Sequence, residues 1–218
     1  MIKQPITDGI KSEAMKHAKD VTEINGEVGH KFGNNSVNQH YIGQIGELIF
    51  RTWLKNHNIH GTHHRYNEDG SSDEYDFKLN GSDKSIDVKT YQIKYNTNYM
   101  LSRNLMYIEE SQITKVMDYY VDCVLDEWQT YAYLRGYILR SDALHNYKVV
   151  NSDNMTTPGY EIPTSNLGDI RELIFKITGK LIDGYVKPPK QYTMEDMMKV
   201  DLSAIPIKPK GQYSMADY

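Results

Sequence analysis

S-D-E-Y-D-F-K-L-N-G-S-D-K-S-I-D-V-K-T-Y-Q-I-K, residues 72–94, alternates apolar and polar side chains in two short runs, Tyr75 to Leu79 and Ile86 to Val88. Such alternation is typical of half-buried β-strands. Between the runs, Asn80-Gly81 is a dipeptide whose backbone tolerates the positive φ angles of a turn. The segment therefore predicts a β-hairpin, next to which the other elements can be placed.

The predicted hairpin carries an unusual set of charges. Because side chains repeat every two residues along a strand, Asp87 and Lys89 project from the same face, about 7 Å apart. The neighbouring strand can bring Asp76 opposite them. Two carboxylates and one ammonium group on one face of a sheet are costly if they serve packing alone. They suit a divalent metal ion and a phosphate; an ordinary hairpin with a solvated charged face is the alternative.

Upstream, residues 41–54 (Y-I-G-Q-I-G-E-L-I-F-R-T-W-L) predict an amphipathic helix. Its apolar side chains recur at helical spacing, at Ile42, Ile45, Ile49 and Trp53. Glu47 lies in the middle of this helix, directly after Gly46 and one turn after Gly43. Each glycine lowers helix propensity by roughly 1 kcal/mol relative to alanine. We therefore expect that something approaches the helix closely near Glu47.

In order along the chain, Glu47 on a helix, then Asp76, then Asp87-Val88-Lys89 resemble the motif of the PD-(D/E)xK nuclease superfamily. The resemblance covers about residues 35–140, and Tyr75 stands where the family has a proline. It implies an α/β fold with a restriction-endonuclease-like core, in which a central mixed β-sheet is flanked by helices. In this chain a C-terminal extension follows that core.

The resemblance also implies roles for these residues. Asp76 and Asp87 would bind Mg²⁺, with Mn²⁺ as a substitute, and the Val88 carbonyl is a possible third ligand. Lys89 would orient or activate the attacking water, or it is only an ion-pair partner of Asp87. Glu47 would complete the acidic cluster through a metal-bound water or a second ion. Candidates of a second tier are Gln44 and Tyr91. Gln112 matches a glutamine of one branch of the superfamily, the RecB-like exonucleases, but the tyrosine of that branch has no counterpart.

The function that the resemblance implies is metal-dependent hydrolysis of phosphodiester bonds by a DNA endonuclease of the restriction, homing, nicking or junction-resolving type. Because one site cuts one strand, cleavage of duplex DNA would require two sites, as in a homodimer. Two alternatives stay open, a catalytically silent DNA-binding or assembly module and an RNA-directed nuclease. The candidate nucleic-acid contacts are Lys31, His40, Lys94 and Arg103. A plain surface connection is the alternative for the loop expected over residues 26–40.

Composition sets limits on these functions. The 218 residues carry a formal net charge of −4, which argues weakly against a nucleic-acid binder. Residues 84–103 nevertheless carry four basic residues against one Asp, a local balance of +3. The single cysteine, Cys123, excludes an internal disulfide framework, and its apolar neighbours suggest a buried thiol. With no apolar run near the roughly 20 residues of a membrane span, we expect a cytoplasmic protein with no membrane partner.

Four histidines lie between residues 57 and 64. Imidazole is a common zinc ligand. However, no cysteine is nearby, and Gly61 interrupts any helix that would align the rings. The pattern favours a solvated loop, with His64 and Arg65 leading into an edge strand.

The remaining segments complete the expected fold, a nuclease-like domain over residues 1–185 followed by a tail or arm over 186–218 that contains Pro, Lys and Met. Helices are expected over 8–24 (Asp8 as N-cap, Asn25-Gly26 as end), 141–147 and 166–179 (Asn166 as N-cap, Gly179 as end); strands over 118–128 and 130–139; and irregular structure over 149–163.

Overall fold

The structure is a computed structural model. The residues that it describes are 1–28, 37–64, 75–93, 104–115, 117–151, 157–182 and 184–185, without the side chains of 24–28. Residues Met1–Tyr185 form one compact unit. The tail expected over 186–218 lies outside the described residues.

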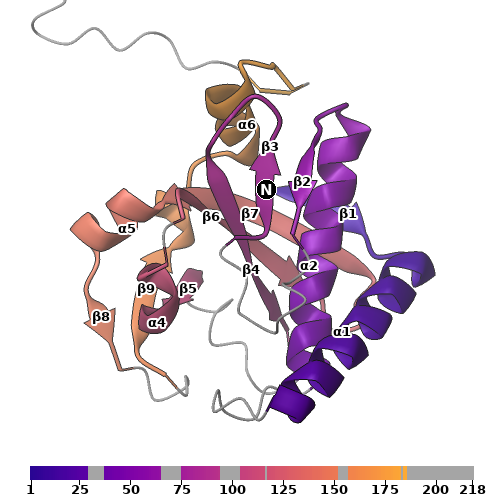
Figure 1. Ribbon diagram of the computed structural model, residues 1–218. Coiled ribbons are helices and arrows are strands. Elements are labelled where there is room, and N and C mark those ends of the chain that lie inside the picture. Colours follow the sequence, from indigo (N-terminus) through magenta and orange to yellow (C-terminus); the bar gives the residue numbers. More distant parts are fainter. Residues whose placement is uncertain are drawn as a thin grey trace, which may run out of the picture. The chain divides into compact units, whose positions relative to one another are not determined.

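Two β-sheets and a set of helices build this unit (Figure 1). The six-stranded sheet has the order β1-β7-β6-β4-β3-β2. Its strands are β1 (Ile2–Pro5), β2 (Gly61–His63), β3 (Phe77–Leu79), β4 (Ser85–Gln92), β6 (Tyr119–Leu125) and β7 (Tyr131–Leu139). The three-stranded sheet consists of β5 (Leu105–Glu109), β9 (Gly159–Pro163) and β8 (Val149–Val150). The helices are α1 (Asp8–Val28), α2 (Val37–Asn56), α4 (Glu110–Ile113), α5 (Arg140–Asn146), α6 (Ile170–Thr178) and the 3₁₀ helix η1 (Thr164–Asn166).

The large sheet is mixed. β4 and β6 run parallel, whereas the other neighbouring strands in this sheet pair antiparallel. The parallel pair requires a crossover connection, and β5 and α4 lie within it. The predicted fold class, a central mixed sheet flanked by helices, is therefore confirmed.

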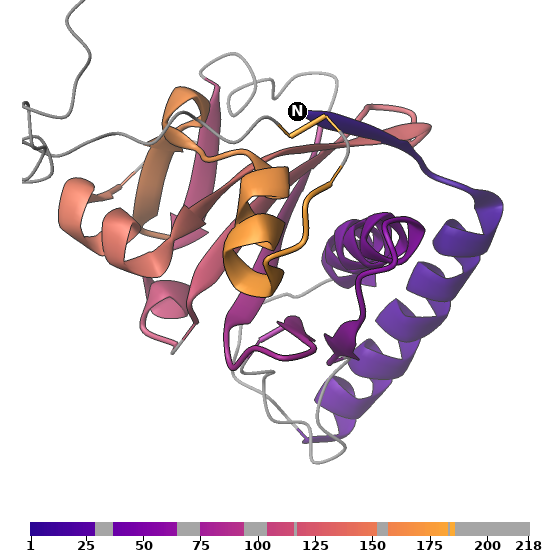
Figure 2. The ribbon, with the colours of Figure 1, turned by 90° about the horizontal axis from the view of Figure 1, so that it is seen from above.

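Different elements cover the two faces of the large sheet (Figure 2). Each face has its own core of buried residues. On one face, buried residues of α1, α2 and α6 pack with Ile86 and Val88 of β4 and with those apolar residues of β6 and β7 that point to this side, such as Val121 and Leu134. On the other face, Tyr120 and Ile138 pack with β5, β9, α4 and α5. Cys123 is buried and free, as its sequence context predicted. None of the described helices is long and apolar enough to cross a membrane.

The predicted hairpin is present as β3 and β4, which pair antiparallel with Phe77 opposite Ile86. Asn80 and Gly81 form the centre of the turn, in which the Ser82 N–H donates to the Leu79 carbonyl at 3.2 Å. Gly81 has a φ of 81°, the left-handed conformation that glycine adopts at little cost. The alternation of apolar and polar residues and the Asn-Gly turn dipeptide were therefore sufficient to predict this hairpin.

One of the two glycines in α2 explains the close approach expected near Glu47. A Cβ atom on Gly46 would lie 1.8 Å from the Thr90 Oγ1 atom of β4, whereas a Cβ atom on Gly43 would meet nothing within 4 Å. The neighbour that approaches the helix is therefore a strand of the protein itself. Gly46 lets α2 lie directly against β4, and this contact sets the position of Glu47.

The predicted N-cap and the predicted end of the first helix are both wrong. α1 does not end at Asn25-Gly26 but continues to Val28, since a glycine in a helix costs only about 1 kcal/mol. Its first N–H groups are capped by Thr7 rather than by Asp8, because the Thr7 hydroxyl accepts from the Ile10 N–H at 3.3 Å.

The last helix begins later than expected. Asn166 belongs to η1, and the N-cap of α6 is Asp169, whose carboxylate accepts from the Arg171 N–H at 2.8 Å. At the other end of the helix the expectation is confirmed, since Gly179 ends α6 with a φ of 71°. Both Asn and Asp are good N-caps, so the choice between them depended on where the preceding chain leaves the sheet.

Several strands were not predicted. Residues 149–163, expected to be irregular, contain β8 and β9, and β1 and β5 were also missed. These strands are short. β1 and β5 pair with segments far away in sequence, β7 and β9, and β8 consists of two residues that pair with β9. In contrast, the hairpin β6–β7 and helix α5 match their predicted segments.

Candidate active site

Asp76 and Asp87 lie side by side where β3 begins. The pairing of Phe77 with Ile86, extended by one residue, places Asp76 directly opposite Asp87. The Asp76 N–H donates to the Ile86 carbonyl at 3.1 Å, and the Asp76 Oδ2 atom accepts from the Val88 N–H at 2.6 Å. Asp76 is thus attached to the edge of β4 through both its backbone and its side chain, which brings together the two carboxylates that the motif predicted.

The electrostatic environment of Asp76 is unfavourable for a negative charge. Burial raises the pKa of Asp76 well above its usual range, and the neighbouring carboxylates of Asp87 and Glu47 raise it further. The Lys89 ammonium group and the Val88 N–H act in the opposite direction but do not cancel these effects. The carboxyl of Asp76 therefore keeps its proton to a higher pH than an exposed aspartate does.

Lys89 lies between Asp87 and helix α4. Its ammonium group forms an ion pair with Asp87 and donates a hydrogen bond to the Gln112 Oε1 atom. The side chains are only 15% and 9% exposed for Lys89 and Asp87, so this pair is largely shielded from water. The Tyr120 ring lies below the ammonium group, 5.7 Å away at its centroid, and the Tyr120 hydroxyl donates to the Gln112 carbonyl at 3.2 Å.

Gln112 thus belongs to the site although the sequence did not place it there. It is 23 residues after Lys89, on a helix of four residues, Glu110–Ile113. A helix that short has no periodicity from which its facing side could be predicted. The similarity to a glutamine of the RecB-like branch was the only sequence signal for it.

Glu47 is held by two donors. Its Oε2 atom accepts from Gln44 Nε2 at 3.0 Å and lies 2.9 Å from His63 Nε2. Gln44, a second-tier candidate, therefore contacts Glu47 as its spacing of one helical turn suggested. His63 was missed, because residues 57–64 were expected to form a solvated loop, whereas Gly61–His63 form the edge strand β2.

The remaining predicted residues do not join this cluster. The Tyr91 hydroxyl donates to the Tyr107 carbonyl and accepts from the Tyr107 N–H at 3.1 Å, which connects the small sheet to β4. Burial raises the pKa of Tyr91 well above its usual range, so the hydroxyl stays protonated. Burial and the neighbouring His17 lower the pKa of His40, so its ring is neutral at pH 7, which weakens its predicted role as a phosphate contact. The other predicted nucleic-acid contacts lie outside the described residues: Lys31, Lys94 and Arg103.

The side chains of the site can be compared with the ligands that a metal ion requires. Among the described side chains, no group of three or more His, Cys, Asp or Glu is arranged to hold one. Mg²⁺ does not need such a group, because it keeps several waters and binds one or two carboxylates together with substrate phosphates. Asp76 and Asp87 provide two such carboxylates. Burial and, after it, repulsion by Asp87 and Glu47 raise the pKa of Asp76, and a bound cation would relieve this repulsion. In the described residues Val88 contacts the cluster through its N–H group, not through its carbonyl.

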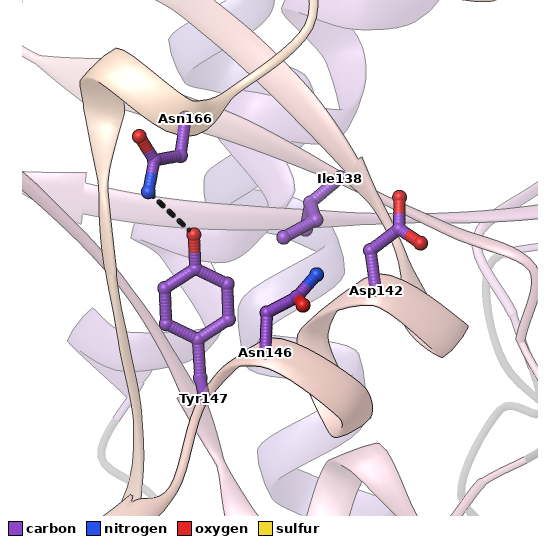
Figure 3. A pocket seen from close by; sticks show the side chains of 5 residues that line it. All are labelled: Ile138, Asp142, Asn146, Tyr147 and Asn166. Atoms are coloured by element: carbon purple, nitrogen blue, oxygen red, sulfur yellow. Dashed lines mark hydrogen bonds between the residues drawn. The ribbon is translucent and has the colours of Figure 1, made fainter.

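A surface pocket of about 360 Å³ lies elsewhere, beside α5 and η1 (Figure 3). It is lined by Ile138, Asp142, Asn146, Tyr147 and Asn166, none of which belongs to the carboxylate cluster. The Asn166 side-chain amide donates to the Tyr147 hydroxyl at 2.7 Å across the pocket. Its polar groups are mostly exposed, whereas the cluster at β4 combines buried charges with a raised pKa. The cluster is therefore the better candidate for an active site.

Fold and site together define a mixed α/β protein that carries an Asp–Asp–Lys cluster on the hairpin β3–β4, with a glutamate on the adjacent helix. No protein-family model, curated protein or solved structure matches the chain. The resemblance to PD-(D/E)xK nucleases therefore depends on the residues of this chain and their geometry.

Proposed function

We propose that this protein is a metal-dependent nuclease that hydrolyses phosphodiester bonds in DNA. The proposal is supported chiefly by one arrangement, the carboxylates of Asp76 and Asp87 opposite each other on β3 and β4 with the Lys89 ammonium group beside them. The raised pKa of Asp76 adds support, because strongly perturbed carboxylates cluster at functional sites more often than on ordinary hairpins.

In this proposal the two aspartates hold a divalent cation, Mg²⁺ or Mn²⁺, together with its waters and a substrate phosphate. When bound, such a cation supplies a more acidic water and neutralises charge on the phosphate. Lys89 orients the attacking water and offsets negative charge at the phosphate, since its ammonium group carries three donors. Gln112 holds that ammonium group from the side of α4, and Glu47 extends the acidic cluster.

A nucleic acid is the substrate in this proposal because the segment 84–103 carries a local charge of +3 on an acidic protein. DNA is proposed over RNA because of the resemblance to the PD-(D/E)xK nucleases. A basic site attracts the phosphate backbone and makes binding salt-dependent. Cleavage of both strands of a duplex would use two copies of the site, as in a homodimer.

A catalytically silent DNA-binding module of the same fold is the second candidate. One observation favours it: Lys89 forms an ion pair with Asp87 and so already neutralises that carboxylate. In such a module the ion pair would serve only the packing of β4 against α4.

Cleavage of supercoiled plasmid, branched DNA and single-stranded RNA, each with Mg²⁺, Mn²⁺ or EDTA, separates these possibilities. We expect metal-dependent cutting of DNA by the wild type and no detectable cutting by Asp87→Asn. Asp83→Asn is the matched control, because Asp83 is exposed in the turn of the same hairpin and loses the same charge. Salt-dependent DNA binding without turnover would support the silent module, and cutting of RNA in preference to DNA would change the substrate class.

A further inference from the structure

His63 connects the edge of the large sheet to Glu47 on helix α2. It is the last residue of β2, and its Nε2 atom lies 2.9 Å from the Glu47 Oε2 atom on α2. The side chains of His63 and Glu47 are 8% and 19% exposed. A hydrogen bond to a carboxylate in such a shielded place is stronger than the same bond in water.

The imidazole ring cannot turn freely. It stacks on Phe77 of β3 with 4.5 Å between the ring centroids and an angle of 6° between the ring planes. Phe77 in turn packs edge-on against Phe50 of α2, at 5.2 Å and 79°. Because His63 and Phe77 are also paired across β2 and β3, backbone and ring stacking together aim the Nε2 atom at Glu47.

The Glu47 carboxylate receives donors from two different elements. Gln44 approaches the Oε2 atom from one turn earlier on α2, and His63 approaches it from β2. Two donors on one oxygen restrict rotation of the carboxylate far more than one donor does. The contact between His63 and Glu47 lies beside the carboxylate pair, because His63 stacks on Phe77 and Phe77 directly follows Asp76 in the chain. The negative charge of Glu47 accordingly helps to raise the pKa of Asp76, after burial and Asp87.

We propose that His63 is a positioning residue, which holds Glu47 toward the Asp76–Asp87 pair and thereby sets the affinity of the site for a divalent cation. This inference rests on the proposed nuclease function. Hydrogen-bond partners behind the ligands of a metal site typically change metal affinity or activity by 10- to 100-fold when they are removed. Loss of the His63 hydrogen bond is expected to weaken cation binding by about that factor.

Two substitutions separate the hydrogen bond from the ring stacking. His63→Gln keeps an N–H donor at nearly the position of Nε2 and loses the flat ring. His63→Phe keeps a flat ring that can stack on Phe77 and loses the donor. A residue that only packs would tolerate Phe better than Gln, whereas a positioning residue shows the reverse order.

The measurements are Mn²⁺ binding, followed by the paramagnetic resonance signal of free Mn²⁺, and the Mg²⁺ concentration that gives half-maximal DNA cleavage. We expect His63→Phe to weaken Mn²⁺ binding roughly 10- to 100-fold and to raise the half-maximal Mg²⁺ concentration in parallel. His63→Gln should stay close to the wild type in both. Thermal unfolding accompanies each variant, and His63→Leu, which also lacks a donor, replaces His63→Phe if the latter does not fold.

Wild-type Mn²⁺ affinity in His63→Phe, or an equal loss in His63→Phe and His63→Gln, would overturn the inference. In the background of Glu47→Gln, His63→Phe should have no further effect on Mn²⁺ binding, and a full additional loss there would also overturn it. Failure of the nuclease proposal looks different: the wild type then binds Mn²⁺ but cuts no nucleic acid, while the order of the two His63 variants in Mn²⁺ binding is unchanged.

Discussion

Replacing either glycine of α2 by alanine tests how the helix reaches the site. At Gly46 the new methyl group would lie 1.8 Å from the Thr90 Oγ1 atom and 2.9 Å from the Thr90 Cβ and Cγ2 atoms. At Gly43 it would meet no atom within 4 Å. Both glycines are inside the same helix, so they share the gain in helix propensity and differ only in packing.

The expected changes in the free energy of unfolding follow from helix propensity and from packing. Glycine to alanine in a helix stabilises by about 1 kcal/mol at either position. Overpacking a filled contact costs about 1–3 kcal/mol, and a separation of 1.8 Å is far inside contact distance, so the upper part of that range applies at Gly46. We expect Gly43→Ala to raise the free energy of unfolding by up to about 1 kcal/mol. Gly46→Ala should lower it by about 1–2 kcal/mol.

Urea denaturation followed by circular dichroism measures both values. Gly46→Ala should also reduce cleavage, because any shift of α2 away from β4 moves Glu47 with it. Thr90→Ala removes the Oγ1 and Cγ2 atoms, so the double variant with Gly46→Ala should recover part of the lost stability. Equal effects of Gly43→Ala and Gly46→Ala on unfolding would refute the proposed contact between α2 and β4.

Further predictions concern the interior and one helix end. Burial raises the pKa of Asp122 to about 6, although the neighbouring Arg135 acts in the opposite direction. Because the pKa of an aspartate in the unfolded chain is near 3.9, the folded protein binds the proton more tightly, and its free energy of unfolding relative to that of Asp122→Asn should fall by roughly 3 kcal/mol as the pH rises from about 4 to 6. Urea denaturation across this pH range measures the change. Tyr91→Phe leaves the backbone N–H and carbonyl of Tyr107 without this partner and should destabilise by about 1–3 kcal/mol, while Mn²⁺ binding by the folded protein stays unchanged. Gly179→Ala forces a side chain to adopt a φ of 71° and should lower the thermal midpoint, at a cost of about 1–2 kcal/mol.

The candidate site divides into residues that the sequence could predict and residues that it could not. Asp87 and Lys89 are two residues apart on one strand, and Asp76 is joined to them by a hairpin, so their proximity follows from local geometry. Gln44 precedes Glu47 by one helical turn, so their contact also follows from local geometry. These relations need only the repeat of a strand, the repeat of a helix and a turn.

The sequence could not predict the contacts of Gln112 and His63 in the site, because these contacts depend on how separate elements pack. The bond from Lys89 to Gln112 requires the crossover through β5 and α4 to fold onto one face of the large sheet. The contact of His63 with Glu47 requires the edge strand β2 to lie beside α2, and nothing in the spacing of four histidines distinguishes the ring that does so.

At Gly46, what the sequence predicts and what only tertiary packing decides can be told apart most clearly. The chain pattern established an amphipathic helix with an unfavourable glycine beside an acidic residue, and so predicted that something lies close to it. Which atom lies there, the Thr90 hydroxyl of the protein's own strand, follows from packing. Periodicity and turn chemistry act over a few residues and can be read along the chain, whereas a steric contact between a helix and a strand 44 positions apart arises only when both are buried against the same core.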